Sequence, residues 1–144
     1  MSFLTALNLS SSGLSAQRLR MDVIASNLAN ISTTRTAGGG PYRRKSPVFQ
    51  TTPVEEGFAS TLQRFTSPLA GVRVVDVVED TSPPRRVYDP KHPDADRSGN
   101  VAYPNINLVA EMVNMLSATR SYEANVTAMR ATKDMTLKAM EIGR

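Results

Sequence analysis

Few residues of the chain are of types that could do chemistry. Cysteine is absent, so no disulfide, thiolate metal site or cysteine nucleophile can form. His92 is the only histidine and lies between Lys91 and Pro93, which predicts a solvent-exposed loop residue rather than part of a catalytic triad. Asp94 and Asp96 are spaced like the start of a calcium loop, but the required glycine and final glutamate do not follow. The sequence therefore predicts no enzyme, no metal and no cofactor.

A small basic cluster is the other candidate for chemistry. Arg43, Arg44 and Lys45 follow Tyr42, and a basic run beside an aromatic residue can bind nucleic acid. However, the net charge of +4 is spread along the chain, whereas nucleic-acid proteins usually concentrate it on one face. We therefore expect a solvated loop or a contact with an acidic neighbour, and no nucleic-acid partner.

The N-terminal segment of the chain is predicted to form one long helix over residues 2–32. Apolar residues recur with the heptad spacing of a helix that packs along another helix. The seam consists of Leu7, Ser10, Leu14, Gln17, Met21, Ile24, Leu28 and Ile31. A second face carries Leu9, Ala16, Leu19 and Val23, so we expect a second packing partner.

A second helix is predicted over residues 105–142, capped at its start by Asn105 or Asn107 and ended by Gly143. Its predicted seam consists of Leu108, Met112, Met115, Thr119, Tyr122, Val126, Met129, Lys133, Thr136 and Met140. At about 1.5 Å per residue, the two helices would be roughly 45 and 57 Å long. Helices of this length suit a coiled coil better than the core of a small globule.

The middle of the chain differs in composition and reads as a β-rich insert. It is rich in proline and glycine, and strands are predicted at 46–52, 58–65, 71–80 and 85–89, with loops at 36–41, 81–84 and 90–100. We therefore expect an α+β fold in which long N- and C-terminal helices pair as a coiled coil around a small β-rich middle insert. The expected divisions are 1–33, 34–104 and 105–144.

Two features of the sequence concern the cellular location of the protein. No run of about 18 apolar residues occurs, so no membrane span is expected. The first basic residue is Arg18, which is unlike a cleaved secretory signal.

Both ends of the chain carry motifs that resemble those of a known family. The stretches "GLSAQRLRMDVIASNLANIST" and "NINLVAEMVNMLSATRSYEANVTAMRATKDM" resemble the terminal signatures of bacterial flagellar axial proteins, the rod, hook and hook-associated proteins. In the middle, "GGGPYRRKSPVFQ" and "VYDPKHPDADRSGN" resemble the short proximal rod proteins of the basal body. The turn "STTRTAGGGPY" replaces the Thr-Pro-Gly-Tyr turn of most axial relatives, and "VEEGFASTLQRFTSPLAG" is longer than expected.

The resemblance implies a structural subunit of the proximal rod, the shaft and export channel that crosses the periplasm. Such subunits are exported by the flagellar type III apparatus without a cleaved signal peptide. Their paired helices line the inner part of the tube and their middle faces outward. The implied partners are other rod proteins, copies of the same chain, the export apparatus and the surrounding rings. The alternative function is that of a coiled-coil adaptor or chaperone of the export system.

Three asparagines lie in the family motifs at positions where a buried helix would not be expected to carry them. We expect Asn30 to take a left-handed or capping role at the end of the first helix. We expect Asn27, and Asn125 on the second helix, to bond across the helix interface and fix its register. The complete expected assembly interface is Leu7, Leu14, Met21, Ile24, Asn27, Leu28, Asn30, Ile31, Leu108, Met112, Met115, Tyr122, Asn125, Val126, Met129 and Met140.

Overall fold

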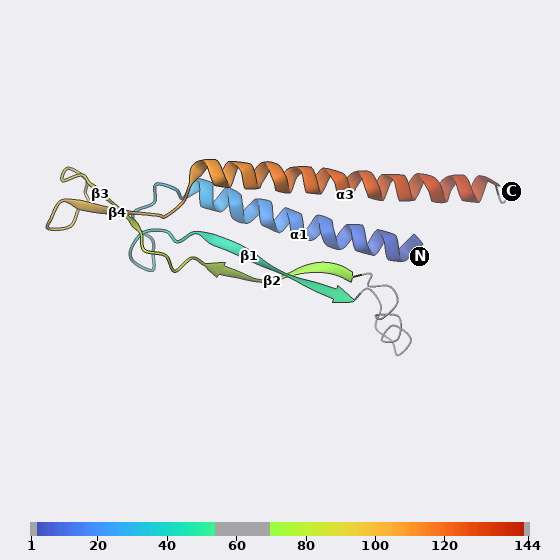
Figure 1. Cartoon of the computed structure of the whole chain (residues 1–144), viewed down its shortest axis with the longest axis horizontal. Helices are drawn as coiled ribbons and strands as arrows, with labels where there is room; N and C mark the ends of the chain where they lie inside the picture. The colour runs from blue at the N-terminus through green and yellow to red at the C-terminus, as the bar shows by residue number, and fades with distance from the viewer. Residues whose placement is uncertain (1–2, 54–69, 143–144) are drawn as a thin grey trace.

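The computed structural model describes residues 3–53 and 70–142. In chain order the elements are α1 (Phe3–Ala29), β1 (Lys45–Pro53), β2 (Ala70–Glu79), β3 (Arg85–Tyr88), β4 (Asn100–Tyr103) and α3 (Leu108–Ile142). The two helices are antiparallel and lie side by side, and the strands come from the middle of the chain (Figure 1). The predicted α+β fold, with paired terminal helices and a β-rich insert, is confirmed.

The molecule is elongated and has three layers, with α1 in the centre. One side of α1 packs along α3, and its other side packs on the β1–β2 hairpin (Figure 1). The Thr119 hydroxyl lies 3.6 Å from the Met21 sulfur, and the Asn27 amide lies 3.1 Å from the Glu111 carboxylate. These contacts fix an antiparallel register in which the last residues of α3 extend beyond the first turn of α1.

The helix ends follow from local hydrogen bonds. Helix α1 ends at Ala29, three residues before the predicted end, where the Asn30 side-chain amide donates to the Ser26 carbonyl at 2.9 Å. Helix α3 begins at Leu108 because Asn107 is its cap, with its side-chain oxygen accepting from the Ala110 N–H at 3.1 Å. The cap at Asn107 was one of two predicted alternatives. Gly143, the predicted stop, lies outside the described residues.

The face of α3 that packs on α1 differs from the predicted seam by one residue in every other position. Its buried and half-buried residues are centred on Glu111, Met115, Ala118, Tyr122, Asn125, Met129, Thr132 and Thr136. Of the predicted set, Leu108, Met112, Lys133 and Met140 are exposed, and Thr119 and Val126 are half-buried. The prediction assumed that large apolar residues would be buried.

Small or polar side chains occupy every other position of this interface, at Glu111, Ala118, Asn125 and Thr132, and the small ones allow the helices to approach closely. A Cβ atom added to Gly13 would lie only 3.0 Å from the Asn125 amide nitrogen.

The second face of α1 packs against the β1–β2 hairpin. The Ser12 hydroxyl accepts from the Val72 N–H of β2 at 3.2 Å, and the helical repeat places Ala16 and Val23, both buried, on the same side. The expected second packing partner is thus part of the same chain. The two strands pair antiparallel from Lys45 opposite Glu79 to Pro53 opposite Ala70, with a bulge between Val48 and Phe49.

The strands predicted at 46–52, 71–80 and 85–89 are confirmed as β1, β2 and β3. The strand expected at 58–65 lies outside the described residues. Strand β4 was missed, because its four residues directly follow a turn-rich segment. Strands β3 and β4 form a second antiparallel hairpin that projects from the end where α1 stops and α3 starts (Figure 1).

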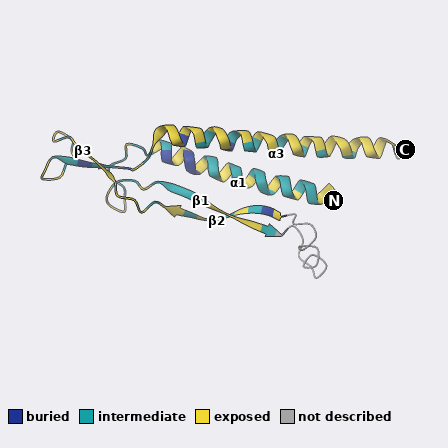
Figure 2. Cartoon of the chain, in the orientation of Figure 1, coloured by how far each residue is buried: buried dark blue, intermediate teal, exposed yellow. Residues whose placement is uncertain are grey.

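The apolar core of the described residues is small. Its buried apolar residues are Ala16, Val23, Ile24, Val101 and Ala118. Figure 2 shows that burial concentrates near the C-terminal end of α1, while most of α3 remains exposed. Two polar residues, Asn27 and Glu111, are buried there as well. None of the described helices has a stretch apolar enough to cross a bilayer.

Candidate functional site: the junction of helices and hairpin

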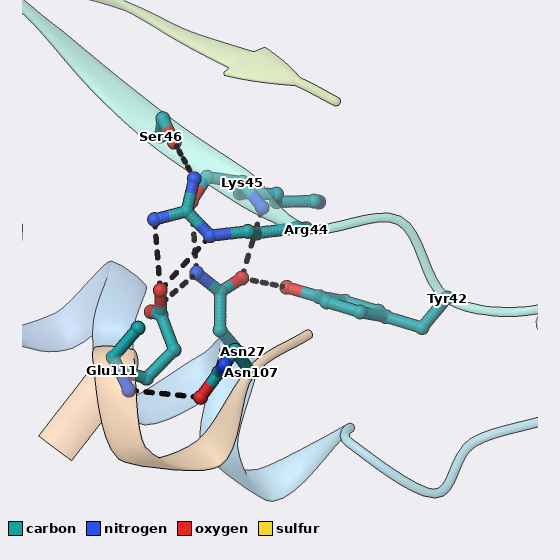
Figure 3. A network of polar contacts seen from close by, with 8 residues as sticks. Asn27, Tyr42, Arg44, Lys45, Ser46, Asn107 and Glu111 are labelled. Carbon is teal, nitrogen blue, oxygen red and sulfur yellow. Dashed lines mark hydrogen bonds and ion pairs between the residues drawn. The ribbon is translucent and has the colours of Figure 1, made fainter. Parts of the chain in front are cut away.

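The three layers meet at one polar cluster, which we call the junction. It consists of Asn27 from α1, Tyr42 and Arg44 from the following loop, Lys45 and Ser46 from β1, and Glu111 from α3 (Figure 3). Residues more than 60 positions apart in the sequence are brought into hydrogen-bond contact here. The junction is therefore where the helix pair is tied to the hairpin.

Asn27 is at the centre of the junction and is fully buried. Its amide nitrogen donates to the Lys45 carbonyl at 2.8 Å and to Glu111 Oε2 at 3.1 Å. Its oxygen accepts from the Lys45 N–H at 2.9 Å and from the Tyr42 hydroxyl at 3.1 Å. The side chain thus makes the four hydrogen bonds that a carboxamide can make, which removes the cost of burying it.

Glu111 brings a carboxylate into the interior with 1% of its surface exposed. Arg44 neutralises it, with its Nη2 atom 2.8 Å and its Nε atom 2.9 Å from Glu111 Oε1. A third guanidinium nitrogen donates to the Ser46 hydroxyl at 2.7 Å, which orients the Arg44 side chain (Figure 3). Glu111 also lies in the first turn of α3, where the helix dipole favours a negative charge. An unpaired carboxylate at this depth would be strongly destabilising.

The three asparagine predictions have different outcomes. Asn27 bonds across the helix interface as expected. Asn30 caps the end of α1 through the Ser26 carbonyl, but no described non-glycine residue has a positive φ, so its left-handed role was wrong. Asn125 donates to the Ser121 carbonyl of its own helix at 3.0 Å, and among the described residues it makes no hydrogen bond across the interface. Its amide packs against Gly13 instead.

Two of the three residues of the basic cluster form ion pairs with acidic residues. Arg44 pairs with Glu111, and the Lys45 ammonium lies 3.6 Å from Glu79 and 5.9 Å from the centre of the Tyr42 ring. The expected contact with an acidic neighbour is therefore confirmed for these two residues. Arg43 remains exposed. Within the cluster, Arg44 supplies the charge that neutralises Glu111 in the junction.

Sequence reasoning missed Glu111 as a functional residue. Its signal was the series Glu111, Ala118, Asn125 and Thr132, in which small or polar residues recur every seven positions beside an apolar series. An acidic residue in such a series predicts a basic partner, and Arg44 is the half-buried arginine that meets it.

The loop around His92 is held in place by side-chain contacts. The His92 side chain is half-buried rather than fully exposed, because its ring packs edge-on against Tyr103 at 6.2 Å between centroids. Asp96 accepts the N–H groups of Ser98 and Asn100 at 2.8 and 2.9 Å, and these bonds lower its pKa below the ordinary value. In the part of the chain that the structure describes, no three His, Cys, Asp or Glu side chains gather where they could hold a metal ion.

The predicted interface residues fall into two groups. The buried or half-buried group consists of Leu7, Leu14, Met21, Ile24, Asn27, Leu28, Asn30, Ile31, Met115, Tyr122, Asn125, Val126 and Met129. Ile31 lies beyond the end of α1 and borders an open depression with Leu108 and Val109. Leu108, Met112 and Met140 are exposed on α3.

Comparison with known proteins connects this architecture to the flagellum. A family model described as flagella basal body rod protein matches residues 7–35, and one described as flagellar basal body rod FlgEFG protein C-terminal matches residues 97–142. These segments contain most of α1 with Asn27, and β4 and α3 with Glu111. Paired terminal helices that carry both models define the class of flagellar basal-body rod proteins.

Full-length relatives identify the family within this class. The flagellar basal-body rod protein FlgC of Bacillus subtilis (strain 168) is 49% identical over 147 residues, covering 96% of this chain and 97% of the relative. The FlgC protein of Borreliella burgdorferi is 44% identical, covering 99% of this chain and 98% of the relative. The FlgC protein of Escherichia coli O157:H7 is 41% identical and covers both chains completely. The chain belongs to the FlgC family of flagellar basal-body rod proteins.

Proposed function

We propose that this rod protein is a non-enzymatic subunit of the proximal rod that assembles with copies of itself and with other rod proteins. The observation that carries the proposal is an apolar stripe on α3, defined by Leu108, Val109, Met112, Val113 and Leu116. These side chains are 49% to 68% exposed, although their types favour burial. An exposed apolar patch of this kind is typical of an interaction surface.

The stripe lies mostly on the side of α3 that points away from α1. The helical repeat places Val109, Val113 and Leu116 opposite the buried residues Glu111 and Ala118, with Met112 at the edge of this exposed face, and Figure 2 shows the first turns of α3 as largely exposed. The α1 helix therefore cannot cover the stripe without leaving its own partner face. A neighbouring subunit would cover it in the assembled rod.

The same proposal extends to the surroundings of the subunit. The helix pair would line the inner part of the rod in the periplasm, and the hairpins would face outward. The chain would reach this place through the flagellar export apparatus without a cleaved signal peptide, and the surrounding rings would be further neighbours. The support for these steps is membership of the FlgC family and a fold in which the β1–β2 hairpin covers one side of the helix pair and the β3–β4 hairpin projects from one end of it (Figure 1).

An aspartate in the stripe tests the proposal. Met112→Asp places a charge in the proposed contact, where burial of an unpaired carboxylate would prevent assembly. The purified variant should keep its helical content, because Met112 is exposed in the isolated chain. In a strain that lacks its own FlgC protein, Met112→Asp should abolish swimming while the subunit is present at its normal level.

Ser117→Asp is the matched control, since Ser117 is exposed on the same helix but lies to one side of the stripe. It should leave swimming intact. Normal swimming by the Met112→Asp strain with normal subunit levels would disprove a role of the stripe in assembly. The adaptor alternative predicts small closed complexes with an export substrate instead of open helical contacts, and native mass measurements distinguish the two.

A further inference from the structure

The contact between Asn27 and Lys45 resembles the pairing of two strands. The side-chain amide of Asn27 bonds both the N–H and the C=O of Lys45, the first residue of β1, at 2.9 and 2.8 Å. A neighbouring β-strand would bond an edge residue in the same two-way manner. Asn27 thus occupies the free edge of β1 and recognises one particular residue of that strand.

We propose that three features together, the Asn27 amide, the Arg44–Glu111 pair and Pro47, set the axial register of the β1–β2 hairpin on the helix pair. The functional consequence, that the rod requires this register, rests on the proposed function. The proposal assigns a positioning role to residues that the hydrophobic pattern does not select.

Away from the junction and the buried Val23, the hairpin–helix contact offers little resistance to sliding. Opposite β2, α1 presents the small residues Ser12 and Ala16, and Ser12 faces Gly71 of the strand. Between this part of α1 and β2, the one described hydrogen bond runs from the Val72 N–H to the Ser12 hydroxyl. Small side chains leave a smooth surface that does not interlock like the large side chains of a packed core. The junction must therefore select the register.

A slip by one residue is excluded by the geometry of the strand. Successive residues of a strand point their N–H and C=O groups to opposite edges. Lys45 points its groups to Asn27, whereas the Arg44 carbonyl accepts from the Asp80 N–H at 2.8 Å on the side of β2. The nearest alternative register is consequently a slip by two residues, about 7 Å along the strand.

Each of the two possible two-residue slips meets its own barrier. A slip that brings Pro47 to Asn27 offers no N–H to the Asn27 oxygen, because proline lacks this donor. A slip in the other direction brings Arg43 to Asn27 and Tyr42 to the position of Arg44. Glu111 then loses its guanidinium partner while it remains buried. Pro47 therefore disfavours one of the two slips, and loss of the Arg44–Glu111 ion pair disfavours both.

Distance measurements between two spin labels test this account. The chain has no cysteine, so Ser15→Cys on α1 and Val78→Cys on β2 supply two unique label sites, both at exposed positions. Because Val78 lies toward the junction end of the hairpin relative to Ser15, the Arg43 slip shortens the distance and the Pro47 slip lengthens it. Pulsed electron resonance on the purified, labelled chain measures the distribution of distances between the two labels, in which each register gives its own population.

The variants separate the two barriers. Pro47→Val alone should keep one unshifted distance, because the ion pair still selects the register. Arg44→Met with Glu111→Met should add a population shortened by up to about 7 Å. Adding Pro47→Val to that pair should produce a further, lengthened population. Replacement of a buried ion pair by apolar residues of similar volume usually preserves the fold.

Unshifted distances in the Arg44→Met/Glu111→Met variant, with native circular dichroism, would overturn the proposal. Unfolding of this variant would also overturn it, because the pair would then be needed for the fold itself. Pro47→Val alone showing a lengthened population would contradict the role given to the ion pair.

A covalent rescue tests the functional consequence in cells. A Cβ atom at Gly71 would lie 3.5 Å from the Ser12 Cβ, a separation that suits a disulfide. Arg44→Met/Glu111→Met should lose swimming, and adding Ser12→Cys with Gly71→Cys should restore it until a reductant is added. Failure of the wild-type chain to complement would refute the proposed function, whereas normal swimming of the unrescued variant would refute only the need for the register.

Discussion

At the scale of single residues, the junction concentrates the polar chemistry of the molecule. Asn27 could be selected from the sequence, because an asparagine on the apolar face of a helix needs an unusual partner. Glu111 could not, because an acidic residue in the first turn of a helix is ordinarily explained by the helix dipole. Only the packing of three layers shows that its carboxylate is buried and that Arg44 neutralises it.

The first prediction concerns the donors of Asn27. Asn27→Asp replaces the amide nitrogen with an oxygen that faces the Lys45 carbonyl and the Glu111 carboxylate, both acceptors. We expect a loss of roughly 3–5 kcal/mol in the free energy of unfolding at neutral pH, the range for an uncompensated buried charge. Urea unfolding measures the loss, and Asn8→Asp at an exposed position of α1 is the control. Equal stability of the two variants would contradict the role of Asn27.

The second prediction concerns the close approach at Gly13. In an exposed helix, glycine to alanine usually stabilises by about 1 kcal/mol. Here the added methyl group meets the Asn125 side chain at 3.0–3.2 Å, so Gly13→Ala should give no gain or a loss. In an Asn125→Ala background the same substitution should raise the thermal midpoint. A raised midpoint in the wild-type background would show that the helices do not approach so closely.

At the scale of elements, heptad periodicity was sufficient to predict both helices, and β-branched residues bounded by turn residues predicted three strands. The heptads located α1 and α3, but in α3 they selected Met112 in place of Glu111 as a seam residue. Periodicity records where apolar residues lie, and it does not reveal which large apolar residues of a helix remain exposed in the folded chain. Strand β4 lacked a signal because Asn100–Tyr103 is short and depends on β3 for its hydrogen bonds.

The β3–β4 hairpin supplies a prediction at this scale. Gly99 has a φ of 75°, and a Cβ there would lie 2.8 Å from the Tyr88 ring. Gly99→Ala should therefore weaken the hairpin through backbone strain and this contact. Hydrogen exchange of residues 100–103 should become faster, while α1 is unchanged. Gly38→Ala is the control, because space is open there and its φ is not positive; equal effects of the two would contradict the account.

At the scale of the whole molecule, the fold is long and weakly packed. Its described apolar core is small, and much of the distal half of α3 is exposed. Isolated helices are marginal in water, so α3 depends on packing against other elements, and α1 is the described element that packs along it. The sequence correctly indicated two packing faces on α1, but it could not reveal that the hairpin of the same chain covers one of them.

The corresponding prediction concerns the protection of backbone amides from hydrogen exchange. In the isolated protein at micromolar concentration, residues near the junction, such as 23–27 and 111–118, should be the best protected helical segments. Amides of residues 130–142 should exchange quickly, because few contacts hold this end of α3. Strong protection of residues 130–142 in a monomer would show that α3 is stable without neighbours. The same measurement on assembled rods should show the distal segment protected.

The antiparallel pairing of α1 and α3 also has a practical consequence. Phe3 and Ile142, the first and last described residues, lie toward the same end of the molecule, and the β3–β4 hairpin lies at the other (Figure 1). A fluorophore attached near Arg97 and another near either terminus would therefore mark the two tips of one rod-shaped particle. Polarised emission from such a pair would report the tilt of each subunit relative to the axis of a spinning motor in a living cell.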